Sequence, residues 1–106
     1  MQQSMQYLKT KELDNVSARN LPIESGDGRT PETAYLLQEI NQFEAPSLEH
    51  LIIDLTLKAS GYLFWELANQ TFTIEEDREI DHLKVHALKH GETKECSFYF
   101  DLTELE

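Results

Sequence analysis

The sequence predicts an α+β domain in which a three- to four-stranded antiparallel meander sheet carries one helix packed on its apolar face. Along residues 71–104, apolar and polar residues alternate with the period of two that is typical of half-buried strands. Two short charged segments interrupt this alternation, as hairpin turns would. Before it, residues 47–60 also carry apolar residues at helical spacing.

The last two strands are predicted by side chains that share a face. In residues 95–103, the apolar face consists of Cys96, Phe98, Phe100 and Leu102. In residues 79–88, it consists of Leu83, Val85 and Ala87. A preceding strand over about residues 65–74 completes the meander. We expect Trp65 to pack between the helix and the sheet.

Both connections in the meander are polar. Residues 89–93 contain Gly91, which suits the positive φ that a hairpin loop needs. Residues 75–78 are charged and lack glycine, so they predict a turn without fixing its type.

Residues 47–60 fit two interpretations. Leucines and isoleucines alternate there as in a strand, at positions 51, 53, 55 and 57. A helix is favoured because Ser47 can cap it, Asp54 and Lys58 lie four residues apart, and Ser60-Gly61 can end it. We expect Leu51 and Leu55 to face the sheet.

The segments before the helix are less regular. Residues 1–24 show no convincing period and predict an N-terminal arm or irregular segment, frayed or helical, while residues 25–106 form the single α+β domain. Glycine and proline mark residues 24–33 as a loop. Residues 34–37 predict a short strand at an edge of the sheet.

Net charge is the most informative bulk property. Nine Lys and Arg against twenty Asp and Glu give a net charge of −11, which predicts no nucleic-acid partner and no membrane partner but favours a basic protein. Plain solubility is the alternative explanation. A single cysteine, no signal-peptide pattern and no apolar run of membrane length predict a cytoplasmic protein.

The run Gly26-Asp27-Gly28-Arg29-Thr30-Pro31-Glu32-Thr33-Ala34-Tyr35 resembles the opening of a group of small uncharacterised bacterial proteins. The resemblance continues at Trp65, Gln70, Gly91 and the final Tyr99-Phe100-Asp101-Leu102-Thr103. The chain has Ile80-Asp81 where that group has Tyr-Asp. It covers about residues 26–103 and implies the fold and a bacterial origin. In size and charge the chain also resembles immunity proteins, which neutralise a toxin encoded beside them.

Three histidines, His82, His86 and His90, are spaced four apart. On a helix they would share a face and suggest a metal site. On a strand, His82 and His86 lie about 13 Å apart, which is too far for joint ligation. We therefore expect solvated histidines, no metal and no cofactor, and keep a small metal protein or enzyme as an alternative. Cys96, on the dry face, predicts a buried apolar residue and not a nucleophile.

Acidic residues cluster in the predicted turns, at Glu75, Glu76, Asp77, Glu79, Asp81 and Glu92. General acid–base work needs a carboxyl in an apolar or like-charged setting, and the tip of a hairpin is the opposite environment. These carboxylates suit a surface that pairs with Lys and Arg of a basic protein, or simply a solvated turn. With no catalytic motif, the sequence predicts a binding protein, most simply an immunity or inhibitor protein against a basic toxin such as a nuclease. A structural subunit that self-associates through a strand edge is a further alternative, and the oligomeric state is open.

Overall fold

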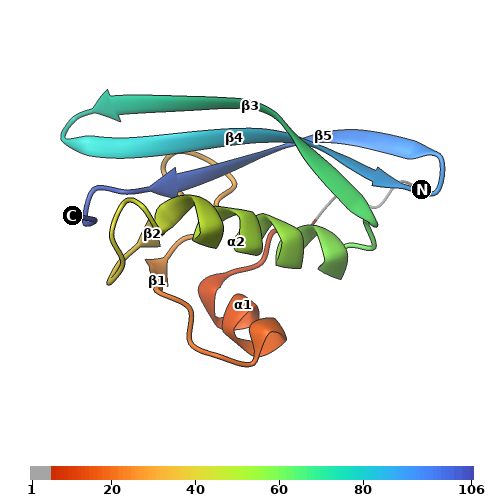
Figure 1. The fold of residues 1–106 in the computed structure, drawn as a ribbon, viewed down its shortest axis with the longest axis horizontal. Helices are drawn as coiled ribbons and strands as arrows, with labels where there is room; N and C mark the ends of the chain where they lie inside the picture. The colour runs from red at the N-terminus through yellow and green to blue at the C-terminus, as the bar shows by residue number, and fades with distance from the viewer. Residues whose placement is uncertain (1–5) are drawn as a thin grey trace.

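A computed structural model describes residues 6–106, which form two helices and one five-stranded sheet (Figure 1). The elements are α1 (Thr10–Ser17), β1 (Ile23–Ser25), β2 (Tyr35–Leu37), α2 (Ala45–Ala59), β3 (Phe64–Glu75), β4 (Arg78–Lys89) and β5 (Glu92–Asp101). The α+β class is confirmed. No helix within these residues is both long and apolar enough to cross a membrane.

The sheet has the strand order β1-β2-β5-β4-β3. The antiparallel meander β3–β4–β5 is present, and two hairpins join its long strands. The prediction was too simple in three respects: the fold has a second helix, α1, the sheet has five strands, and β2 runs parallel to β5, pairing Tyr35 with Phe100. β2 is not an edge strand, because β1 pairs with its other side. A three-residue strand carries too little pattern to predict these pairings.

The core lies between the sheet and α2, with α1 below α2 (Figure 1). The predicted apolar faces of β4 and β5 are confirmed, and all their members are buried: Leu83, Val85, Ala87, Cys96, Phe98, Phe100 and Leu102. Phe100 is fully buried and packs on Tyr35, with 5.6 Å between ring centroids.

The helix interpretation of residues 47–60 is confirmed, but its start and its inward face differ from the prediction. The helix begins at Ala45, with Pro46 in its first turn, so Ser47 is not the cap. Its buried face includes Ile52, Ile53 and Leu57, whereas Leu51 and Leu55 are only partly buried. The reason is that α2 packs against the sheet on one side and α1 on another, which buries a wider face than a single stripe.

The C-terminal half of the helix follows the expected chemistry. Asp54 and Lys58 form an ion pair at 3.0 Å, and Gly61 takes a φ of +87° just after the helix ends. Trp65 is partly buried and its indole N–H donates to Asp54 at 3.1 Å. The indole therefore lies at the edge of the helix–sheet interface, as expected.

Residues 8–23 contribute to the same core. Leu8, Leu13, Leu21 and Ile23 are each at most 7% exposed. The first helix is short but well started, since the backbone N–H of Lys9 donates to the Glu12 side chain at 3.0 Å. The predicted arm spans residues 1–24, of which residues 1–5 lie outside the described part of the chain.

We predict that Phe100→Ala lowers the free energy of unfolding by about 3–5 kcal/mol, because it leaves a large cavity against Tyr35. Phe43→Ala is the matched control, since Phe43 is 96% exposed and its loss should cost less than about 0.5 kcal/mol. Urea denaturation measures both. Equal effects of the two changes would show that the face containing Phe100 is not the core.

Candidate functional site

The face of the sheet opposite α2, here called the outer face, holds a hollow of about 440 Å³ beside the β3–β4 turn. Its floor is formed by β4 and β5, one side by β3, and the other by the loop over residues 26–33. The lining residues are Pro31, Glu32, Thr71, Thr73, Glu75, Glu76, Arg78, Ile80, His82 and Tyr99.

The loop is held against the sheet by several hydrogen bonds. The backbone N–H of Tyr99 donates to the carbonyl of Gly28 at 2.9 Å, and the Asp27 and Gly28 N–H groups both donate to the Thr33 carbonyl. Gly28 has a φ of +72°, and a Cβ there would lie 2.2 Å from the Tyr35 ring. These contacts fix the wall that carries Pro31 and Glu32.

Arg78 connects this wall to the hairpin. It donates to the Pro31 carbonyl at 2.8 Å and to the Asp101 carboxylate at 3.2 Å. Asp101 is buried and also accepts hydrogen bonds from Thr103. The cation in the hollow is therefore already paired, whereas Glu32, Glu75 and Glu76 form no ion pair within residues 6–106.

Two aromatic rings form the floor. His82 stacks on Tyr99 with 4.3 Å between ring centroids and 17° between planes, and its Nε2 lies 2.9 Å from the Ser97 hydroxyl. Burial, followed by the nearby Lys84, lowers the pKa of His82, which favours the neutral ring at pH 7. A neutral aromatic floor beneath free carboxylates suits a Lys or Arg side chain of a partner.

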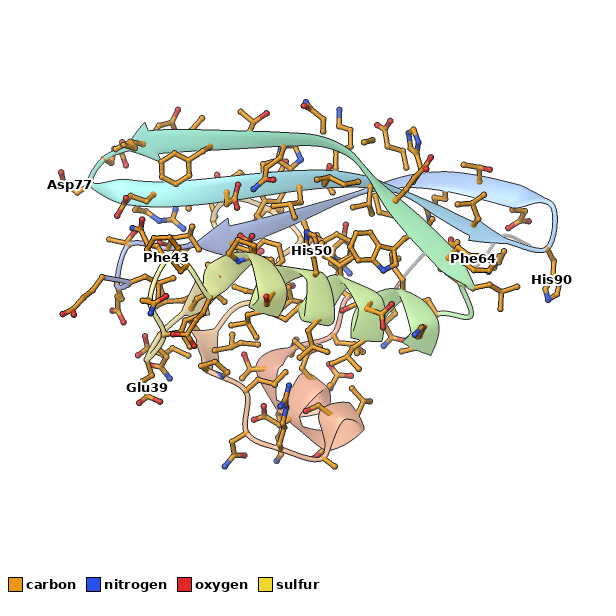
Figure 2. All side chains as sticks on the ribbon, in the orientation of Figure 1. Glu39, Phe43, His50, Phe64, Asp77 and His90 are labelled. Carbon is orange, nitrogen blue, oxygen red and sulfur yellow. The ribbon has the colours of Figure 1, made fainter. Side chains whose placement is uncertain are left out.

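The β3–β4 turn places three of the predicted partner-binding residues together. Glu76 and Asp77 both have positive φ, 49° and 66°, which identifies the two-residue turn as type I′. Glu75, Glu76 and Asp77 are exposed at this tip, where Figure 2 labels Asp77 at the extreme of the hairpin. Glu79 follows on β4 and is partly buried. We call Glu32, Glu75, Glu76 and Asp77 the acidic tip.

Two predicted partner-binding residues lie elsewhere. Glu92 begins β5 in the other hairpin, at the opposite end of the sheet. Asp81 is only 4% exposed and points to the α2 side, where the Gln70 amide donates to both of its oxygens at 3.0 and 2.9 Å. Asp81 is therefore too buried to form a direct ion pair with a partner protein.

The histidines are also separated. His86 lies 3.9 Å from Glu66 and 3.5 Å from Glu95, while His90 lies at the far β4–β5 turn (Figure 2). Within residues 6–106, no group of three or more His, Cys, Asp or Glu side chains is placed to hold a metal ion. Cys96 is buried, and burial raises the pKa of its thiol, so the reactive thiolate is disfavoured.

A buried carboxyl pair was missed by the sequence interpretation. Glu49 on α2 is 1% exposed and lies against Asp81, and its Oε2 has no hydrogen-bond donor within the described residues. Burial first, and then the contact with Asp81, raise the pKa of Glu49 to about 10. Glu49 is thus neutral at pH 7. Both groups are closed to solvent, so no substrate reaches them.

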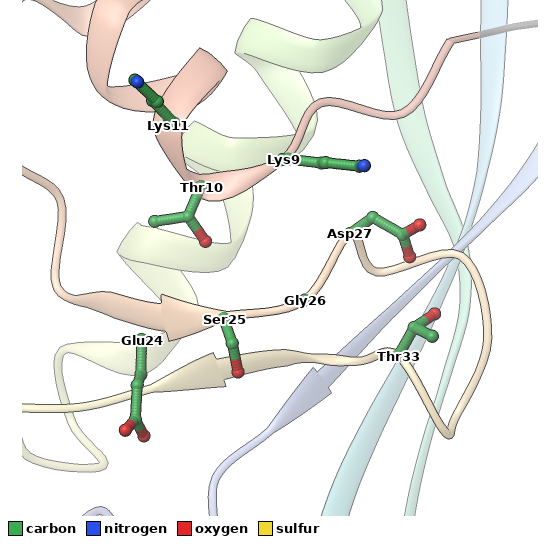
Figure 3. Close-up of a pocket in the computed structure, with 8 residues that line it drawn as sticks. All are labelled: Lys9, Thr10, Lys11, Glu24, Ser25, Gly26, Asp27 and Thr33. Carbon is green, nitrogen blue, oxygen red and sulfur yellow. The ribbon is translucent and has the colours of Figure 1, made fainter.

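A second hollow of about 340 Å³ lies between the start of α1 and β1 (Figure 3). Lys9 and Lys11 stand on one side and Glu24 and Asp27 on the other. These mixed charges leave no strong preference for either sign of ligand, in contrast to the acidic tip.

Compared with known proteins, the chain matches no protein-family model, no curated protein and no solved structure. The site is therefore interpreted from its own residues.

We predict that Glu49→Gln flattens the dependence of stability on pH. In the wild type, the folded state keeps the Glu49 proton, whereas the unfolded chain releases it above the ordinary pKa of 4.5. The stability that Glu49 contributes is therefore complete below pH 4.5 and is lost as pH rises toward 10. One such proton changes the free energy of unfolding by up to about 1.4 kcal/mol per pH unit.

Glu49→Gln carries a permanent N–H donor toward Asp81, so its free energy of unfolding does not fall in this way as pH rises. Urea denaturation at several pH values should show Glu49→Gln more stable than the wild type at pH 8, with the difference shrinking toward pH 5. Parallel curves for the two proteins would mean that Glu49 does not retain a proton in the fold.

Proposed function

We propose that this chain is a small acidic binding protein that neutralises a basic protein by occlusion, as an immunity or inhibitor protein does to a toxin such as a nuclease. The observation that carries the proposal is the acidic tip beside an aromatic-floored hollow on a rigid hairpin. A nuclease exposes Lys and Arg to hold phosphate, and carboxylates in fixed positions compete for the same cations.

Rigidity supports this role. Three of the four carboxylates of the acidic tip, on Glu75, Glu76 and Asp77, lie at the end of a twelve-residue antiparallel pair, β3 and β4. The register of this pair runs from Glu75–Arg78 to Phe64–Leu88. Arg78 ties this end to the 26–33 loop through Pro31. The backbone that carries these carboxylates is therefore already ordered, which lowers the entropy lost when a partner binds.

The electrostatics support a basic partner. The net charge of −11 attracts cations at long range, while the acidic tip offers carboxylates that no lysine or arginine of the described chain neutralises. Long-range attraction raises the association rate, and the tip supplies the local contacts. We propose a cytoplasmic location, where such an inhibitor would meet a toxin made in the same cell.

We predict that reversing the three hairpin carboxylates of the acidic tip, with Glu75→Lys, Glu76→Lys and Asp77→Lys together, abolishes capture of the basic partner. The matched control reverses Glu66, Glu92 and Glu95, which are exposed and lie away from the tip. Both variants change the net charge by the same amount, so long-range attraction falls equally in the two.

The experiment is a pull-down from cells that encode the chain, followed by mass spectrometry. A basic protein should be retained by the wild type and by the control variant, lost with the tip variant, and eluted by rising salt. Equal retention by the two variants would refute the role of the tip. If all three proteins retain no basic partner, the proposed function is wrong.

A further inference from the structure

The free edge of β3 is a surface that the proposed function does not use. Within residues 6–106, Phe64–Glu75 pairs only with β4, and every one of its residues except Trp65 is exposed. Figure 1 shows its second half as the outermost strand of the sheet. The backbone N–H and C=O groups on this side have no partner strand, so the edge is a template for another strand.

This edge lacks the usual protection against strand pairing. The segment contains no lysine, arginine or proline, and its only charges are Glu66 and Glu75. Phe72 and Ile74 lie on the α2 side of the sheet and are 50% and 69% exposed. A bulge between Leu67 and Asn69 interrupts the pairing, so the longest regular stretch is Asn69–Glu75.

We propose that a second copy of this chain occupies the edge, pairing Asn69–Glu75 antiparallel to itself about a twofold axis at Phe72. The two five-stranded sheets then form one continuous sheet. The inference is independent of the proposed function.

The choice of a second copy follows from the sequence of the edge, which is complementary to itself. With Phe72 facing Phe72 of the second copy, Gln70 faces Ile74, Thr71 faces Thr73 and Asn69 faces Glu75. In this register no carboxylate faces another carboxylate. The facing residues include one aromatic pair and two threonine pairs, which stabilise strand pairing. Among registers centred within the regular stretch, only this one uses all seven residues, Asn69 to Glu75.

The geometry limits the assembly to a dimer. The other edge of the sheet is β1, which has three residues and an irregular register, so it offers no second strand template. Facing residues of two antiparallel strands lie on the same side of the sheet. The twofold axis that relates the two copies is therefore perpendicular to the sheet. Both acidic tips and hollows then lie on the same side, where one basic surface can meet two copies.

We expect a weak dimer, in the micromolar range, because seven paired residues bury little surface and each copy carries a charge of −11. Salt screens this repulsion and should tighten the dimer, whereas salt weakens binding to a basic partner. The opposite salt dependences distinguish self-association from the proposed function.

Sedimentation velocity of the full chain across the micromolar range tests the inference. The wild type should show a monomer–dimer equilibrium that tightens with salt. Phe72→Lys places two cations at the axis and should weaken the dimer by about tenfold or more, although it lowers the net negative charge. Phe64→Lys is the matched control on the same strand, 72% exposed and outside the paired stretch, and should not weaken it.

Disulfide crosslinking tests the register even if Phe72→Lys folds poorly. Under mild oxidation, Phe72→Cys should form a covalent dimer, because facing side chains of paired strands come within disulfide reach. Ile74→Cys lies on the same side but faces Gln70 of the second copy, and should crosslink far more slowly. The native Cys96 is buried and takes no part.

Several outcomes would overturn the inference. A wild type that stays monomeric at every concentration, equal effects of Phe72→Lys and Phe64→Lys, equal crosslinking of the two cysteine variants, or growth beyond a dimer would each do so. A salt-tightened dimer with crosslinking through position 72 would establish it.

Discussion

The whole molecule depends on a sheet that is apolar on one side only. The inner faces of β4 and β5 bury Leu83, Val85, Phe98 and Phe100 against α2, and no helix covers the other side within residues 6–106. Burial of these side chains is the main source of stability. This arrangement leaves three surfaces exposed: the outer face, the acidic tip and the edge of β3.

The Glu49–Asp81 pair places two ionisable groups in that core, which also contains the buried hydroxyl of Thr56. Two adjacent carboxyls closed to water cannot both ionise, so one proton stays in the fold at neutral pH. Gln70 reaches across from β3 to donate to Asp81, which ties the edge strand to the same cluster. The pair therefore links α2, β4 and β3.

Sequence reasoning predicted the parts of the fold that have strong periodicity. Alternation placed Val85 and Phe98 inside correctly, and the spacing of Asp54 and Lys58 indicated the helix. It did not predict the parallel pairing of β2, since Tyr35–Leu37 has too few residues to show a direction. The surface position predicted for Asp81 is wrong: aspartate is usually exposed, but the same alternation puts Asp81 on the buried face with Leu83 and Val85.

The central claim is that the outer face around the acidic tip contacts a basic protein, and amide hydrogen exchange of the complex tests it most directly. Exchange would be compared for the chain alone and with its captured basic partner. The account predicts new protection at residues 29–33 and 71–82, with α1 and α2 unchanged. Protection confined to α1, α2 or the hollow beside Lys9 would contradict it.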